Sequence, residues 1–191
     1  MAYSALFDAC ALFPNDLRDL FLRLGEERLY RTLWSDDILA EMERNILRVN
    51  PHLTSEKLAR TVSLMREYFP EATVTGHESL IDVMTNTQHD RHVLAAAVRG
   101  RADVIVTSNI KHFPPDSVEP YDLDVQTPDQ FLLHQFHLAP NIVMEALAQQ
   151  AADNARPPQT VPDLLDLLAR YTPEFADAVR SHTRAGQDGA R

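Results

Sequence analysis

The sequence predicts an α/β fold, in which a parallel sheet flanked by helices is followed by an all-helical C-terminal extension. Through about residue 137, short apolar segments typical of strands alternate with segments of helical periodicity. This alternation indicates a parallel sheet with helices on both faces. From Leu138 onward no strand pattern remains, and prolines separate three amphipathic segments. We therefore predict one domain over residues 1–137 and a helical extension over residues 138–191.

The predicted strands are short and rich in apolar residues, as expected of strands that are covered on both faces. In chain order they are Ala2–Phe7, Leu29–Trp34, Thr73–Thr75, Ala102–Val106 and Tyr121–Gln126. A sheet of about four or five strands follows from these segments.

The predicted helices have apolar residues at positions i, i+3 and i+4, and prolines, glycines or capping residues mark their ends. In the first domain they are Pro14–Leu24, which Gly25 is expected to end, Ser35–Val49, Thr54–Phe69, Glu78–Met84, His89–Gly100 and Thr127–His137. In the extension they are Asn141–Ala155, Thr160–Arg170 and Pro173–Ser181.

Composition restricts the class of protein. The apolar and charged fractions, 45% and 24%, are those of a globular domain. The sequence has no charged-then-apolar leader and no apolar run that could span a bilayer, so we expect a cytoplasmic protein without a membrane segment. The single Cys10 cannot form an internal disulfide and is expected to pack as a small apolar residue. The net charge of −10 argues against a protein that coats nucleic acid. It does not exclude a nuclease, because carboxylates that hold cations also contribute negative charge.

Polar residues stand where the predicted strands end or where helices begin. Asp8 directly follows the first strand, Asn109 lies just beyond the strand 102–106, and Asp90 opens a helix. Glu41 lies about a turn and a half after Ser35, the predicted N-cap of its helix. Ligands of open α/β sheets bind at the carboxyl ends of strands. A buried acid such as Asp8 needs a positive partner, and Mg²⁺ or Mn²⁺ takes oxygen ligands of this kind.

These acids also have structural interpretations. Asp8 and Asp90 could serve only as helix caps. Glu43 competes with Glu41, but it points about 200° away around the same helix.

Other polar residues are expected to have structural roles. Asp103 lies inside a strand and could tie down a loop, and Asp36 and Asp37 complement the helix dipole. His89 and His92 are three residues apart, but the sequence offers no Cys pair or third nearby His to complete a zinc site.

Three further residues have possible functional roles. Arg44 and Arg48 are spaced i, i+4 on one helix face and could contact phosphates, although solvated surface charge is the simpler interpretation. Ser108 lacks the Gly-x-Ser-x-Gly context of a nucleophile and is better suited to orienting a carboxylate, a water or a phosphate.

Four segments, taken in order, resemble the PIN-domain nucleases and most closely the VapC-type toxins. They are Asp8 after the first strand, the Ser-x-x-x-Leu-Ala-Glu sequence ending at Glu41, the sequence from Asp90 through Ala97, and Val-Ile-Val-Thr-Ser-Asn ending at Asn109. The resemblance spans most of residues 2–133. The family's pattern has a fourth acid where Asn109 stands, and asparagine brings a carbonyl oxygen but no charge.

The resemblance implies a PIN-like sheet and a metal-dependent endoribonuclease that hydrolyses RNA phosphodiester bonds. Asp8, Glu41 and Asp90 would hold Mg²⁺ or Mn²⁺, and Asn109 with Ser108 would orient a water or a ligand. The resemblance further implies that the protein is the toxin of a toxin–antitoxin pair, that a small antitoxin inhibits it, and that it forms a homodimer.

Three alternatives remain open on the sequence. One is an RNA-processing PIN nuclease that is not a toxin. Another is a receiver-like phosphoacceptor module, whose Thr and Lys could be Thr107 and Lys111. The third is a binding module without nuclease activity, which the asparagine at position 109 suggests. Metal-dependent RNA cleavage would separate the nucleases from the other two.

Overall fold

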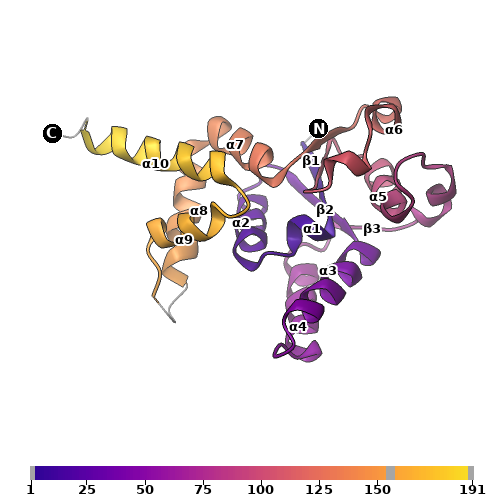
Figure 1. Cartoon of the computed structure of the whole chain (residues 1–191), viewed down its shortest axis with the longest axis horizontal. Coiled ribbons are helices and arrows are strands. Elements are labelled where there is room, and N and C mark those ends of the chain that lie inside the picture. Colours follow the sequence, from indigo (N-terminus) through magenta and orange to yellow (C-terminus); the bar gives the residue numbers. More distant parts are fainter. Residues whose placement is uncertain (1–2, 154–157, 189–191) are drawn as a thin grey trace. The chain divides into compact units, whose positions relative to one another are not determined.

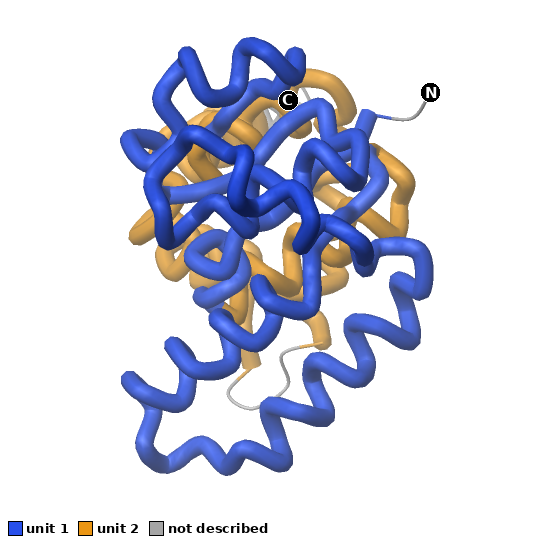
Figure 2. Tube along the Cα trace, turned by 90° about the vertical axis from the view of Figure 1, so that its right-hand side faces the viewer, with its two compact units in different colours: residues 1–14, 30–126 blue, residues 15–29, 127–191 orange. Residues whose placement is uncertain are grey.

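The structure is a computed structural model, and it describes residues 3–153 and 158–188. The chain divides into two compact units (Figure 2). Unit 1 contains residues 1–14 and 30–126, and unit 2 contains residues 15–29 and 127–191. None of the helices within the described ranges is long and apolar enough to cross a membrane.

Unit 1 is built on a five-stranded parallel sheet with the strand order β3-β2-β1-β4-β5 (Figure 1). The strands are β1 (Ser4–Phe7), β2 (Arg31–Ser35), β3 (Thr73–Val74), β4 (Val104–Val106) and β5 (Asp124–Gln126). The predicted α/β class with a parallel sheet is therefore confirmed, and all five strands lie where the apolar segments placed them. The order differs from the 2-1-3-4-5 order of receiver-like folds, which removes the basis for the receiver-like alternative.

Helices and 3₁₀ turns connect the strands of unit 1. They are α1 (Ala9–Leu12), α3 (Asp36–Val49), α4 (Ser55–Tyr68), η1 (Glu78–Val83), η2 (Gln88–Asp90), α5 (Arg91–Gly100), η3 (Ile110–His112), α6 (Pro115–Val118) and η4 (Glu119–Tyr121). The predicted cap of α3 is present, because the Ser35 hydroxyl accepts a hydrogen bond from the Ile38 N–H at 3.2 Å.

Helix α5 lies against the sheet, and its alanines are fully buried. The helix ends at Gly100, as predicted, at a point of close approach. A Cβ atom at Gly100 would lie 2.8 Å from Val74 Cγ2 and 3.2 Å from Leu33 Cδ1. Only a residue without a side chain lets the end of this helix reach the sheet.

Several predicted boundaries were wrong in detail. The segment after Asp8 forms the short helix α1, and Glu78–Val83 is a 3₁₀ helix. Helix α2 (Asn15–Glu26) continues through Gly25, and the chain turns at Arg28, whose φ is 58°. Gly25 therefore does not end the helix, because the non-glycine Arg28 takes the left-handed conformation.

Each element that the structure assigns within the described residues of unit 2 is a helix. It combines α2 with α7 (Pro128–Leu138), α8 (Pro140–Asp153), α9 (Val161–Leu168) and α10 (Pro173–Asp188). Helix α7 begins with the predicted capping box, in which Thr127 and Gln130 satisfy each other's backbone N–H groups. The last two residues of the predicted helix 141–155 lie outside the described residues.

The division of the chain by contacts differs from the predicted domain boundary at residues 137 and 138. Helices α2 and α7 group with the C-terminal helices, because α2 contacts α8 and α9 while α7 contacts α8 and α10. The apolar stripe of α2 is completely buried and comprises Leu17, Leu20, Phe21 and Leu24.

Phe131 is a central packing residue of unit 2. It is fully buried, and its ring meets that of Phe21 edge to face at 5.9 Å. We expect Phe131→Ala to lower the free energy of unfolding by about 3–5 kcal/mol, because it leaves a cavity in a packed interior. Chemical denaturation would measure this. Leu138→Ala, at a side chain that is 73% exposed, should change stability by no more than about 0.5 kcal/mol. Equal effects at the two positions would contradict this account of the core.

Candidate active site

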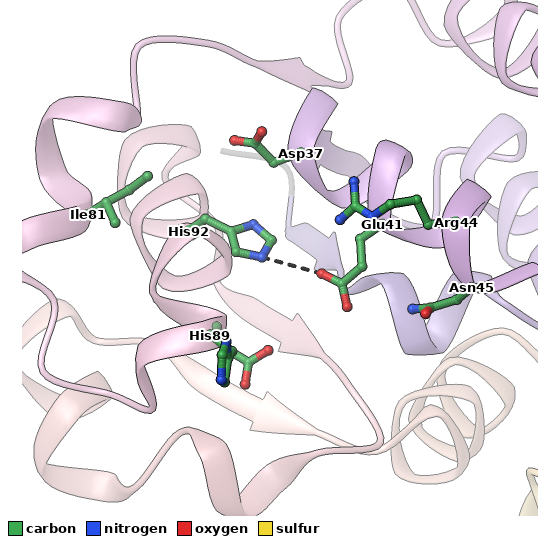
Figure 3. A pocket seen from close by; sticks show the side chains of 8 residues that line it. Asp37, Glu41, Arg44, Asn45, Ile81, His89 and His92 are labelled. Carbon is green, nitrogen blue, oxygen red and sulfur yellow. Dashed lines mark ion pairs between the residues drawn. The ribbon is translucent and has the colours of Figure 1, made fainter. Parts of the chain in front are cut away.

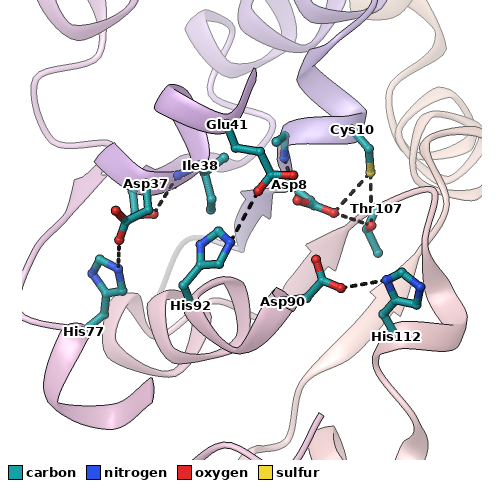
Figure 4. A network of polar contacts seen from close by, with 12 residues as sticks. Asp8, Cys10, Asp37, Ile38, Glu41, His77, Asp90, His92, Thr107 and His112 are labelled. Atoms are coloured by element: carbon teal, nitrogen blue, oxygen red, sulfur yellow. Dashed lines mark hydrogen bonds and ion pairs between the residues drawn. The ribbon is translucent and has the colours of Figure 1, made fainter. Parts of the chain in front are cut away.

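Three carboxylates meet at the carboxyl ends of the strands in unit 1, and each comes from a different element (Figure 4). Phe7 pairs with Val106 across β1 and β4, so Asp8 and Thr107, the residues that follow them, leave the sheet side by side. The Asp8 N–H donates to the Val106 carbonyl at 3.0 Å. Glu41 extends from α3, and Asp90 stands at the junction of η2 and α5.

Asp8 is buried within a set of hydrogen-bond donors. Its Oδ1 accepts from the Ala9 N–H at 2.6 Å, so the predicted capping role is also present. Its Oδ2 accepts from the Thr107 hydroxyl at 2.6 Å and from the Cys10 thiol at 3.1 Å. Burial raises the pKa of Asp8, the Thr107 and Cys10 hydrogen bonds lower it, and the charges of Asp90 and Glu41 raise it further. The charges of Asp90 and Glu41 therefore act on the Asp8 carboxylate.

Glu41 faces His92, which lies on α5. His92 Nε2 is 3.4 Å from Glu41 Oε2. The His92 hydrogen bond lowers the pKa of Glu41, against the effect of burial. Burial lowers the pKa of His92, but its interactions with the Glu41 carboxylate outweigh this effect, so the pKa of His92 is raised.

Asp90 is held by His112. Nδ1 of His112 lies 2.6 Å from Oδ2 of Asp90, and the Asp90 side chain makes no capping hydrogen bond to α5. The Thr87 N–H donates to the His112 carbonyl at 3.1 Å, and the His112 N–H donates to the Asn109 carbonyl at 2.8 Å. His112 thus connects the turn that carries Asn109 with the turn that carries Asp90.

Asn109 and Ser108 contact this cluster through hydrogen bonds from their backbone N–H groups. The Asn109 N–H donates to Thr107 Oγ1 at 3.0 Å, and the Ser108 N–H donates to the Cys10 sulfur at 3.2 Å. Within the described ranges, the structure records no side-chain hydrogen bond for either residue. Their predicted role in orienting a water or a ligand stays a prediction.

The donor set can be compared with what a divalent cation needs. Among the residues that the structure describes, no three His, Cys, Asp or Glu side chains are grouped closely enough to hold a metal ion. Each carboxylate instead contacts a local donor, on Thr107, His92 or His112. The chemistry of the set nevertheless fits Mg²⁺ or Mn²⁺, because it offers carboxylate oxygens whose mutual repulsion a cation would relieve.

Comparison with known proteins gives matches to VapC50. Residues 128–181 match the family model described as the VapC50 C-terminal domain. A protein of Mycobacterium tuberculosis (strain ATCC 25618 / H37Rv), named as a presumed ribonuclease, VapC50, is 45% identical over 105 residues. Both matches support the resemblance to VapC-type PIN-domain ribonucleases. The match covers 55% of this chain and 62% of the relative, so the chain spans less than two thirds of that protein's length. No solved structure matches it.

The C-terminal family match agrees with the division into units. It begins at residue 128, at the start of α7, whereas unit 2 resumes at residue 127. The group of helices that follows the sheet therefore includes α7, which the sequence had assigned to the first domain.

Sequence reasoning missed several partners of the carboxylates. Cys10 was expected to be only a packing residue, but its thiol donates to Asp8, and burial raises its pKa to about 12. Thr107 could be placed next to Asp8 only from the register of β1 and β4. His92 and His112 carry no sequence signal for their roles, since each meets its carboxylate through tertiary structure. The zinc interpretation of His89 and His92 gains no support.

The structural interpretation of Asp103 is confirmed, because its Oδ2 accepts from the Ser4 N–H at 2.7 Å. This hydrogen bond ties the start of β4 to the start of β1, away from the three carboxylates.

A cavity of about 640 Å³ lies beside the carboxylates of this site (Figure 3). Its walls are formed by Asp37, Glu41, Arg44, Asn45, Ile81, His89, Asp90 and His92. Glu43 is not among them, which agrees with the choice of Glu41. Asp37 had been expected only to complement the helix dipole, but it faces the cavity and pairs with the buried His77 at 3.1 Å.

Thr107 offers a test of how Asp8 is held. Thr107→Val removes the hydroxyl that donates to the buried Asp8 carboxylate, so the pKa of Asp8 should rise further. We expect the free energy of unfolding at pH 7 to fall by about 1.5–3 kcal/mol, the range for hydrogen bonds to charged groups. The loss should shrink near pH 4, where Asp8 is increasingly protonated. Urea denaturation at both pH values would measure it.

Thr61→Val is the matched control for Thr107→Val. The Thr61 hydroxyl donates only to a backbone carbonyl of α4, that of Lys57, at an exposed position. Its substitution should change stability by no more than about 0.5 kcal/mol. A loss for Thr107→Val that did not depend on pH would argue against a role in holding the Asp8 charge.

Proposed function

We propose that this chain is a metal-dependent endoribonuclease of the VapC type that acts as the toxin of a toxin–antitoxin pair. One observation carries the proposal. Three carboxylates from distant segments, Asp8, Glu41 and Asp90, meet at the carboxyl ends of the strands of a VapC-type chain, and the charges of two raise the pKa of the third. Carboxylate charges that act on one another in this way are an arrangement that a bound cation would stabilise.

Asp8, Glu41 and Asp90 would hold Mg²⁺ or Mn²⁺. When bound, such an ion activates a water for in-line attack on a phosphodiester and stabilises charge on the leaving oxygen. The protein's own part is to hold these oxygens in place. Thr107 and Cys10 orient Asp8 through the hydrogen bonds they donate.

The other two carboxylates are oriented by imidazoles. His112 holds Asp90, and His92 holds Glu41. Asn109, with Ser108, is proposed to orient the water or the substrate, because the amide carbonyl can accept a hydrogen bond without adding charge.

The wider biological role rests on the family. We propose that the chain acts in the cytoplasm as a homodimer, and that a small antitoxin protein inhibits it. An arginine of such an antitoxin could take the place of the cation, since a guanidinium pairs well with carboxylates. Growth arrest on expression, relieved by the product of a neighbouring gene, would test the toxin role. An RNA-processing nuclease would cleave RNA without that growth effect.

Cleavage of RNA by the purified full-length chain tests the activity. We expect structured RNA to be cut in Mg²⁺ or Mn²⁺, to remain intact in EDTA, and to be cut again when excess metal is added. Asp90→Asn should remove the activity. Cleavage that persisted in EDTA, or in the Asp90→Asn protein, would mean that the chemistry lies elsewhere.

A further inference from the structure

Two arginines continue the face of α3 that carries Glu41. Arg44 lies three residues after Glu41 and lines the cavity, and Arg48 lies one turn further along. Residues spaced three or four apart are neighbours on a helix surface. The face therefore leads from the proposed metal site to two positive charges.

Both arginines are exposed, and no close contact fixes either side chain among the described residues. Within the described part of the chain, the structure gives Arg44 and Arg48 no ion pair and no side-chain hydrogen bond. Arg66, on the neighbouring helix α4, instead pairs with Asp36 at 2.8 Å. In a chain with a net charge of −10, acidic partners are abundant, yet among the described residues these two arginines form no ion pair, so their charges are available to an external anion.

The position of Arg44 brings it close to the reacting region. Arg44 lines the same cavity as Glu41 and Asp90. Figure 3 shows the Arg44 side chain on the α3 wall, with His89 and Ile81 on other walls of the same cavity. An exposed imidazole and an apolar side chain suit an unstacked base, because bases of single strands stack on such groups.

We propose that Arg44 and Arg48 bind two phosphates of a single-stranded RNA on one side of the scissile bond, so that the strand runs along α3 away from Glu41. The inference rests on the proposed ribonuclease function and assigns part of its substrate site. The two residues are separated by about 6 Å along the helix axis. This separation is between one and two times the rise per nucleotide of a stacked strand, which is about 3.4 Å. The two guanidinium groups can thus reach different phosphates of one strand.

The test measures RNA binding without cleavage. Fluorescence anisotropy would follow a labelled single-stranded RNA of twelve nucleotides binding to the full-length Asp8→Asn chain, at a fixed low Mg²⁺ concentration and several KCl concentrations. Arg44→Gln and Arg48→Gln should each weaken binding and reduce the slope of log K against log salt by about 0.7, and together by about 1.4. A second oligonucleotide of different sequence should give the same changes, because phosphate contacts carry no sequence information.

Arg60→Gln is the matched control. Arg60 is an exposed arginine on α4, and its loss removes the same charge from the chain without touching the proposed path. It should leave the affinity and the salt slope unchanged.

Two outcomes would overturn the inference, and they can be told apart from failure of the proposed function. If the Arg44 and Arg48 variants keep the parental slope, or if Arg60→Gln reduces it equally, the phosphates do not follow α3. RNA cleavage by the unsubstituted chain would still support the nuclease. If that chain neither binds nor cleaves RNA in Mg²⁺ or Mn²⁺, the proposed function fails and the inference fails with it.

Discussion

Asp8→Asn is expected to abolish RNA cleavage and, at the same time, to raise the melting temperature of the metal-free protein. The cleavage rate should fall by more than about 100-fold, because even residues that only support metal ligands contribute 10- to 100-fold. Asparagine keeps the size of the side chain and an oxygen for the Ala9 N–H that caps α1. The substitution also removes the negative charge of Asp8, which burial and the charges of the neighbouring carboxylates disfavour.

The gain in stability should depend on pH in a defined direction. The pKa of Asp8 is raised in the folded protein, chiefly by burial, so the folded state holds this proton more tightly than the unfolded chain does. The metal-free wild type should therefore lose stability as pH rises from about 3.9, the ordinary pKa of aspartate, through the raised value. The Asp8→Asn protein should show no such loss of stability, because an asparagine side chain does not titrate. The difference in melting temperature should be small near pH 3.5 and largest at pH 7.

Asp103→Asn is the matched control for this experiment. Asp103 is also an aspartate next to a strand of the same sheet, but it accepts the Ser4 N–H at 2.7 Å and lies outside the proposed metal site. Its substitution should preserve cleavage and should not raise the melting temperature. If Asp8→Asn kept its activity, or melted below the wild type at pH 7 without metal, Asp8 would be a structural residue.

Deletion of the C-terminal helices is expected to make the protein aggregate. A chain that ends at Gln126 lacks α7–α10 but keeps α2, because α2 lies between β1 and β2 in the sequence. The apolar stripe of α2 would lose α8 and α9, which it contacts in unit 2. Burial of its four large side chains contributes about 6–12 kcal/mol, which is comparable with the total stability of a domain. Size-exclusion chromatography with light scattering would measure the association.

A rescue variant makes the deletion experiment specific. Replacing Leu17, Leu20 and Leu24 by glutamine in the truncated chain removes most of the exposed apolar stripe. These changes should reduce aggregation, whereas a full chain that lacks only residues 189–191 should behave as the parent. A truncated chain that stayed monomeric without the substitutions would show that α2 does not depend on these helices.

Much of the fold could be predicted because local patterns and tertiary structure agree. The predicted strand Ala102–Val106 contains β4, whose three residues are all buried. Gly100 ends α5 at a point where no side chain fits. Helix α2 has an apolar stripe that the sequence also reveals. Its grouping with the C-terminal helices is not visible there, because an apolar stripe does not specify which helix will cover it.

The site could be predicted only in part, for a related reason. Asp8, Glu41 and Asp90 follow from strand ends, a helix cap and the resemblance to PIN-domain nucleases. The contact of His112 with Asp90 and that of His92 with Glu41 depend on how turns and helices meet in space. No spacing along the chain encodes such contacts.

The most direct test of the central claim is calorimetric titration of the full-length protein with Mn²⁺ at pH 7. The account predicts that Asp8→Asn, Glu41→Gln and Asp90→Asn each weaken binding by at least about tenfold. Asp37→Asn, at a carboxylate that lines the same cavity but pairs with His77, should retain the wild-type affinity. If the three substitutions left Mn²⁺ binding unchanged, or if Asp37→Asn weakened it as much as they do, Asp8, Glu41 and Asp90 would not form the metal site.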